Sequence, residues 1–214
     1  MPRKRVAILI SGRGSNMAAL IEAAKAPDYP AEIALVVSNR PDAAGLARAK
    51  AEGIAAAVVD HKPYGRDREA FERALDGVLE AHRIELVCLA GFMRLLSPWF
   101  VQRWHGRMLN IHPALLPDFK GLDTHARALA AGAKLHGATV HFVVADMDSG
   151  PIVKQEPVPV EAEDTVETLS ARVLEVEHRI YPEALKLLAQ GRLSIADGAC
   201  QIAPEQKGVI QVSR

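Results

Sequence analysis

Cysteine is scarce in this chain of 214 residues, which contains only Cys88 and Cys200. Two cysteines this far apart provide neither a disulfide framework nor the paired spacing of a zinc site. Cys88 also lies inside an apolar run, and no nucleophile elbow surrounds any serine, so a covalent Ser or Cys mechanism is disfavoured. We therefore expect two free thiols in a reducing compartment.

The chain also has no excess of charge and no long apolar run. It contains 26 Lys and Arg against 26 Asp and Glu, which gives a formal net charge of zero. A neutral field gives no reason to expect nucleic acid or an anionic membrane as a partner. The apolar run at residues 6–10 is too short for a signal peptide, and none approaches the length that spans a bilayer. We expect a soluble, cytoplasmic protein.

Short apolar runs alternate with helical patterns through the first half of the chain. The runs lie at residues 5–11, 33–39, 54–60 and 84–91. Strands so uniformly apolar are typical of a mostly parallel sheet buried on both faces. Further strands are predicted at 108–112, 137–144 and 151–160. The pattern predicts one α/β domain, a Rossmann-like three-layer sandwich with a mostly parallel mixed sheet.

A long helix is predicted from about residue 165 to 188. Asp164 and Glu167 have capping-box spacing at its start, and Pro182 should kink or split it. Residues 194–214 read as a strand and a loose tail, to which we assign no function.

The segment SGRGSN at residues 11–16 follows the first strand and opens the first helix. Backbone N–H groups and the helix dipole favour an anion at such a position. Met17 stands where a dinucleotide fingerprint needs a third glycine, and the second strand ends without an acid to hold a ribose. A mononucleotide or sugar phosphate is therefore favoured over a dinucleotide, and a turn that only reverses the chain is the alternative.

Polar residues interrupt two neighbouring apolar strands. Asn110 and His112 share one face of the strand at 108–112, while His141 lies in the next strand and Asp148 in the link after it. An amide donor, an imidazole and a carboxylate fit acyl transfer with oxyanion stabilisation and proton transfer by the histidine. We expect Asp148 to raise the pKa of His112. A metal site lacks supporting ligand spacing, and His141 is alternatively a hydrogen-bonded core residue.

Glu177 lies on the apolar face of the long helix, at three- and four-residue steps from its hydrophobic neighbours. A buried carboxylate needs a cation or hydrogen-bond donors. Its partner is either internal, such as Arg172, Arg179 or a histidine, or the amine of a ligand.

In their order and spacing, these motifs resemble the folate-dependent phosphoribosylglycinamide formyltransferases, within the wider formyltransferase superfamily. The resemblance runs from Val6 to about Leu193. It rests on SGRGSN at 11–16, LAGFMRLLS at 89–97, NIHPALLP at 110–117, HGATVHFV at 136–143, DMDSGPI at 146–152 and EHRIYPEAL at 177–185.

The resemblance implies transfer of a formyl group from 10-formyltetrahydrofolate, as co-substrate, to the amine of 5'-phosphoribosylglycinamide (GAR) in purine synthesis, without a metal. It implies a formyltransferase domain at 1–193, with a nucleotide-binding half at about 1–100 and a folate-binding, catalytic half at about 101–193. The implied catalytic residues are Asn110, His112 and Asp148. GAR would contact Gly14, Ser15, Asn16 and Glu177. Folate would contact Arg68, Met93, Arg94, Leu95, Leu96, Val144, Ala145, Asp146 and Met147, with Thr139 and His141 as supporting residues.

Related activities remain as alternatives. A formyltetrahydrofolate hydrolase shares the three catalytic residues but normally has an extra N-terminal regulatory domain, whereas this chain starts at its first strand. A methionyl-tRNA formyltransferase normally has a large RNA-binding C-terminal domain. A non-catalytic nucleotide or folate sensor could keep the fold. We expect a monomer or a homodimer.

Overall fold

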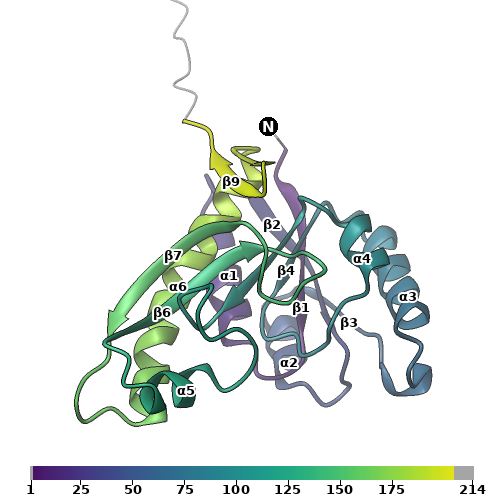
Figure 1. Cartoon of the computed structure of the whole chain (residues 1–214). Helices are drawn as coiled ribbons and strands as arrows, with labels where there is room; N and C mark the ends of the chain where they lie inside the picture. Colours follow the sequence, from purple (N-terminus) through teal and green to yellow (C-terminus); the bar gives the residue numbers. More distant parts are fainter. Residues whose placement is uncertain (1, 205–214) are drawn as a thin grey trace, which may run out of the picture.

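A seven-stranded sheet forms the centre of the protein (Figure 1), which the computed structural model describes for residues 2–204. Its order is β3-β2-β1-β4-β5-β6-β7. The first five strands of this order are parallel, and the pairings of β6 with β5 and with β7 are antiparallel. The predicted mixed, mostly parallel sheet is confirmed. The strands are β1 (Lys4–Ile10), β2 (Ala31–Ser38), β3 (Ala55–Val58), β4 (Leu86–Leu89), β5 (Met108–His112), β6 (Leu135–Phe142) and β7 (Ile152–Pro159).

Helices cover both faces of the sheet. One face carries α1 (Ser15–Ala24), α2 (Ala44–Ala51) and α6 (Val166–Ala189), and α5 (Thr124–Ala130) packs against α6. The other face carries α3 (Arg68–Ala81) and α4 (Pro98–Arg103), and a short 3-10 turn, η1 (Lys62–Tyr64), precedes α3. These are the three layers that the alternation of apolar and helical segments predicts.

The first strand shows why the sequence requires two helical layers. Val6, Ile8 and Ile10 pack into the core beneath α1 and α6, whereas Ala7 and Leu9 pack into the core beneath α3 and α4. All five side chains are fully buried. A strand of this kind has no face for water, so both of its faces must be covered.

The start of the helix α6 differs from its prediction. Its N-cap is Thr165, which forms a capping box with Thr168, so the predicted Asp164 and Glu167 box is wrong. Thr168 has a hydroxyl that can serve at N3 as the Glu of the usual box does. The helix also runs through Pro182 as one element, so the split that was one of the two predicted effects of this proline does not occur. Tyr29 Oη donates to the Pro182 carbonyl at 2.7 Å.

A buried tyrosine fixes α6 to the centre of the sheet. The Tyr181 hydroxyl lies 2.9 Å from the Leu89 carbonyl and 3.1 Å from the Leu109 carbonyl, at the junction of β4 and β5. Glu177, one helical turn earlier, is thereby held toward the carboxyl ends of the central strands.

The predicted C-terminal strand and tail are only partly described. The segment after α6 forms a hairpin of two strands, β8 (Leu193–Ala196) and β9 (Ala199–Ile202), where one strand was expected. Residues 205–214 of the predicted tail lie outside the described residues. Within residues 2–204, every helix is too short or too polar to cross a bilayer.

Candidate active site

The glycine loop joins β1 to α1 and borders a cavity of about 420 Å³. Gly14 has a φ of 73°, a left-handed conformation that suits glycine, and α1 begins at the next residue. Gly45 of α2 packs closely on the end of β1 and on this loop, since an added Cβ would lie 2.5 Å from Ile10 Cδ1 and 3.1 Å from the Gly12 carbonyl oxygen. The free N–H groups of the first turn of α1 therefore lie in a rigid loop beside the cavity, as an anion site requires.

Glu177 is joined to this loop by one neutral hydrogen bond. Asn16 Nδ2 donates to Glu177 Oε2 at 2.9 Å, and both side chains are buried. Of the internal partners expected for Glu177, the two arginines are wrong, because Arg172 pairs with Asp164 and Arg179 pairs with Glu156. Burial raises the pKa of Glu177 to about 7, and the hydrogen bond from Asn16 lowers it by less than burial raises it. A carboxylate in this state is a strong acceptor for an external amine.

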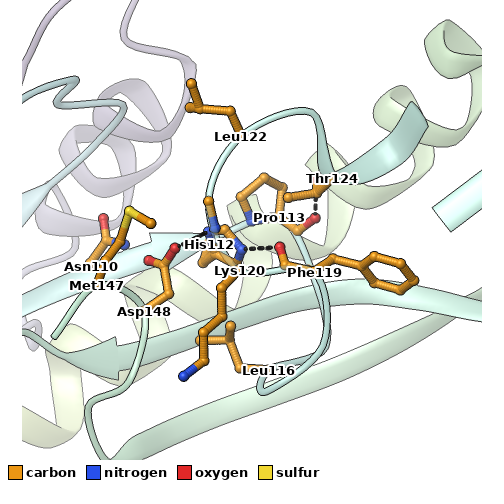
Figure 2. A network of polar contacts seen from close by, with 12 residues as sticks. Asn110, His112, Pro113, Leu116, Phe119, Lys120, Leu122, Thr124, Met147 and Asp148 are labelled. Carbon is orange, nitrogen blue, oxygen red and sulfur yellow. Dashed lines mark hydrogen bonds and ion pairs between the residues drawn. The ribbon is translucent and has the colours of Figure 1, made fainter. Parts of the chain in front are cut away.

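The three predicted catalytic side chains come together at the ends of β5 and β6 (Figure 2). His112 Nδ1 lies 3.4 Å from Asp148 Oδ2, and Figure 2 shows the carboxylate facing the imidazole. Asn110 pairs in register with His141 of β6, and its amide nitrogen lies 3.2 Å from His141 Nε2. His141 Nε2 in turn lies 3.7 Å from Asp148 Oδ1. One carboxylate therefore faces two imidazoles, and the amide completes the group.

Burial and the neighbouring acceptors act in opposite directions on the pKa of His112. Burial lowers it, and this outweighs the Phe119 carbonyl and the Asp148 carboxylate, both of which raise it. The net pKa lies below the ordinary value, and Asp148 acts on it in the expected direction. His112 Nε2 lies 3.0 Å from the Phe119 carbonyl, so both ring nitrogens face acceptors.

Asp148 is placed by an unusual backbone. It has a φ of 51°, which is uncommon for a residue with a side chain, and its Oδ2 accepts the Gly121 N–H at 2.9 Å. Gly150, two residues on, approaches the Phe142 carbonyl so closely that an added Cβ would lie 1.8 Å from the oxygen. Burial would raise the pKa of Asp148, but His141, the Gly121 N–H and His112 together hold it below its ordinary value.

The two supporting residues have different roles. His141 is buried, and its Nδ1 lies 2.8 Å from the Phe142 carbonyl. One of its ring nitrogens thus fits the alternative of a hydrogen-bonded core residue. Its other nitrogen nevertheless contacts the site. Thr139 pairs with His112 across the strands, and its hydroxyl donates to Ala114 and accepts the Leu116 N–H. Thr139 therefore holds the loop that follows His112.

The residues that the resemblance implies for folate differ in their exposure. Arg68 is exposed at the start of α3, and Leu96 is buried in the core beneath α3 and α4. Met93 and Leu95 expose more than half of their surface, as does Met147. In the same loop as Met147, Ala145 and Asp146 are exposed and Val144 is half-buried, and Arg94 lines the cavity beside the glycine loop.

Three polar cavity residues were missed by sequence reasoning: Asn39, Arg40 and His61. Ser11 Oγ donates to Asn39 Oδ1 at 2.6 Å and accepts the Met93 N–H at 2.8 Å, which ties three strand ends together. His61 Nδ1 lies 2.8 Å from the Asn39 carbonyl. The signal was the polar end of the second strand, Ser38 to Arg40, which was considered only for the acid that it lacks. No cluster of three or more His, Cys, Asp or Glu side chains suited to a metal ion occurs in the described part of the chain.

Comparison of the sequence with known proteins gives a consistent result. A sequence profile described as formyl transferase matches residues 4–185. Phosphoribosylglycinamide formyltransferase of Haemophilus influenzae is 45% identical over 194 residues, which cover 91% of each chain. The trifunctional purine biosynthetic protein adenosine-3 of Gallus gallus is 53% identical over 193 residues. The chain spans about a fifth of the length of such trifunctional relatives, since the match covers 90% of this chain and 19% of that protein.

Solved structures are similar to this chain in fold and in sequence. Glycinamide ribonucleotide transformylase 1 of Symbiobacterium toebii superposes with a TM-score of 0.91 at 46% identity, covering 94% of this chain and 95% of that one. A formyltetrahydrofolate deformylase of Pseudomonas syringae superposes with a TM-score of 0.87 at 26% identity, covering 94% of this chain but 66% of its own.

Proposed function

The chain belongs to the formyl transferase family, and we propose that it transfers the formyl group of 10-formyltetrahydrofolate to the amine of 5'-phosphoribosylglycinamide in purine biosynthesis. The products are the N-formyl ribonucleotide and tetrahydrofolate. The proposal agrees with the activities that its relatives are named for, and it assigns the two ends of the ribonucleotide to two features of this chain.

The observation that carries the proposal is the hydrogen bond between Asn16 and Glu177. It joins a loop suited to a phosphate, Gly14 to Asn16, to a buried carboxylate whose only polar partner within residues 2–204 is an amide. A substrate with a phosphate at one end and an amine at the other satisfies both features. A substrate that lacks the amine would leave Glu177 without a cation.

The formyl carbon would lie between Glu177 and the residues of β5 and β6. The amine nitrogen attacks the formyl carbon, and the carbonyl electron pair moves to oxygen. The Asn110 amide and His112 stabilise this oxyanion. The tetrahedral intermediate then loses its bond to N10 of the folate, while the amine gives up a proton and N10 gains one. His112 is the proton carrier, and Asp148 favours its charged form.

The ring of His112 must change partners for this step. Its Nε2 faces the Phe119 carbonyl and its Nδ1 faces Asp148, so neither nitrogen is directed to a substrate. Because Asp148 orients the ring, the Phe119 contact is the one that a substrate would replace.

The folate would lie along the exposed side of these residues. Met93, Leu95 and Met147 present large apolar side chains to solvent, which suits the flat ring of a pterin. We assign Arg94, Leu96 and the segment 144–147 to the same site, and Arg68 to its outer end. His141 and Thr139 position Asp148 and the loop after β5.

The test is a formyl-transfer assay with purified protein and 10-formyltetrahydrofolate. We expect tetrahydrofolate to appear only when the ribonucleotide is present, with one formyl group transferred for each folate released. Release of formate and tetrahydrofolate without the ribonucleotide would identify a hydrolase, the activity of the Pseudomonas syringae deformylase. No turnover with or without the ribonucleotide would favour a sensor.

A further inference from the structure

The helix α3 carries a fully buried carboxylate, Glu72, that takes no part in the proposed reaction. Within residues 2–204 it forms no ion pair, and both of its hydrogen bonds come from one residue. The Ser97 N–H donates to Glu72 Oε1 at 2.7 Å, and the Ser97 hydroxyl donates to Oε2. Burial raises the pKa of Glu72, and these bonds lower it by less than burial raises it. A carboxylate here lowers stability, whereas an apolar side chain of similar size would not.

The packing of α3 against α4 does not require this carboxylate. The helix α4 has its own cap, because Ser97 Oγ accepts the Phe100 N–H at 3.3 Å and Pro98 occupies the first turn. In a capping box, the side chain of the third helical residue accepts the N–H of the N-cap residue. Phe100 stands at that position and has no acceptor, so Glu72 of another helix accepts this N–H instead. The point at which the chain enters α4 is therefore fixed to α3.

The chain enters α4 through the segment 91–97, which forms neither helix nor strand and includes the residues assigned to the folate at 93–96. Near its start, the Met93 N–H is bonded to Ser11 Oγ at 2.8 Å. At its end, the Ser97 N–H is bonded to Glu72. In the described part of the chain, these are the only two backbone N–H groups of the segment that reach an acceptor. Two side chains from other elements thus hold the segment, one near each end.

We propose that Glu72 is a positioning residue of the folate site. The proposal rests on the proposed function, in which residues 93–96 contact the folate. By fixing Ser97, Glu72 limits the conformations of the segment 91–97 and keeps it ready to bind. Without this acceptor the segment would spend less time in the binding conformation, and the apparent affinity for the folate would fall in proportion. Since Glu72 is buried away from the reacting atoms, the chemical step should not change.

Asp76 provides a matched control on the same helix. It lies one turn after Glu72 and is also buried. Its carboxylate accepts Trp104 Nε1 at 2.9 Å and Arg103 Nε at 3.1 Å. The helices α3 and α4 lie side by side (Figure 1), and Asp76 joins them at the end of α4 that is remote from the segment 91–97. A variant of Asp76 should therefore loosen the two helices without releasing the segment.

The experiment measures kcat and both KM values in variants of Glu72. Glu72→Met keeps the size and removes the strong acceptor, whereas Glu72→Asp keeps the charge on a side chain shorter by one methylene. Both should raise the KM for 10-formyltetrahydrofolate by about 5- to 20-fold, with kcat and the ribonucleotide KM changed by less than about twofold. Glu72→Gln can still accept the Ser97 N–H, so its folate KM should be within about threefold of the wild type. Asp76→Asn should lower the thermal midpoint and leave the folate KM unchanged.

Amide hydrogen exchange, followed by NMR without substrates, tests the anchor independently of turnover. The Met93 N–H is bonded to Ser11 and does not contact Glu72, so its exchange reports the whole segment. It should be faster in Glu72→Met and Glu72→Asp than in the wild type, and unchanged in Asp76→Asn. The dissociation constant of tetrahydrofolate, measured by calorimetry, should rise in the same two variants.

Three results would overturn the proposal: an unchanged folate KM in Glu72→Met and Glu72→Asp, an equal rise in Asp76→Asn, or a rise confined to the ribonucleotide KM. If Glu72→Met does not fold, the comparison of Glu72→Asp with Glu72→Gln decides. In each case formyl transfer by the wild type would still stand, so the proposed function would survive. Absence of transfer and of folate binding in the wild type would overturn the function itself, whatever the Met93 exchange shows.

Discussion

Asn16 Nδ2 donates a hydrogen bond of 2.9 Å to Glu177 Oε2, which joins two residues 161 positions apart in the sequence. The contact links the start of α1 to the middle of α6 and leaves Glu177 buried without a cation in the described structure. A buried carboxylate without a cation lowers the stability of the folded protein, but it remains available to bind the amine of a substrate. The burial of Glu177 should therefore affect both the free energy of unfolding and the kinetics of the reaction.

The first prediction concerns the dependence of stability on pH. The pKa of Glu177 is raised from its ordinary 4.5 to about 7, so the folded protein binds this proton more tightly than the unfolded chain. Stability is therefore greatest below about pH 4.5 for this group and falls as the pH rises through 7, by about 3 kcal/mol in all. Glu177→Gln should remove this fall, as measured by urea unfolding between pH 5 and 8. The exposed neighbour Glu175→Gln serves as the control, and an unchanged pH profile in Glu177→Gln would contradict the assignment.

The second prediction concerns the same substitution in the reaction. Glu177→Gln replaces a charged acceptor by a neutral one, so the KM for the ribonucleotide should rise or kcat should fall. The effect should be about 10- to 100-fold, because hydrogen bonds to charged groups contribute about 1.5–3 kcal/mol. The KM for the folate should change little. A loss confined to the folate would place Glu177 elsewhere in the site.

The third prediction concerns the catalytic group. His112→Ala and Asp148→Asn should each lower kcat by about 10²- to 10⁴-fold, as loss of a positioned proton carrier does. The thermal midpoint should report whether each variant folds. Asp118→Asn, an exposed carboxylate in the loop after His112, should have near wild-type kinetics. Turnover close to wild type in either variant of the pair would exclude the mechanism.

The fourth prediction concerns the ionisation of His112. Burial lowers its pKa, and Asp148 acts in the opposite direction. Removing the negative charge with Asp148→Asn should therefore lower the pKa of His112 further. An NMR titration of the ring in the wild type and in the variant checks the sign. A higher pKa in the variant would mean that Asp148 does not stabilise the imidazolium.

The fifth prediction concerns the anchor of α6. Tyr181→Phe leaves two buried carbonyls, Leu89 and Leu109, without the hydroxyl that lies between them. The free energy of unfolding should fall by about 1–3 kcal/mol, the cost of an unsatisfied buried group. Tyr64→Phe is the control, since its hydroxyl has no hydrogen bond within residues 2–204. Equal stability of the two variants would show that packing alone holds the helix.

Much of the fold could be predicted because burial leaves a local record in the sequence. The uniformly apolar β1 requires helices on both faces, and its pattern is visible without coordinates. The details of α6 were less predictable. Its cap depends on which hydroxyl reaches a free N–H, and its passage through Pro182 depends on packing that supports the helix after a lost hydrogen bond.

The sequence by itself determined the types of residue in the site: Asn110 and His112 on one strand face, Asp148 after the next strand, and Glu177 on an apolar helix face. Only the tertiary structure decided their partners. It gave Arg172 and Arg179 to other carboxylates, directed Asn16 to Glu177, and brought arginines from three loops to one cavity. The physical reason is the distance along the sequence over which each effect acts. Periodicity and strand polarity act over a few residues, whereas the pKa of a buried group depends on every charge and donor that folding brings near it.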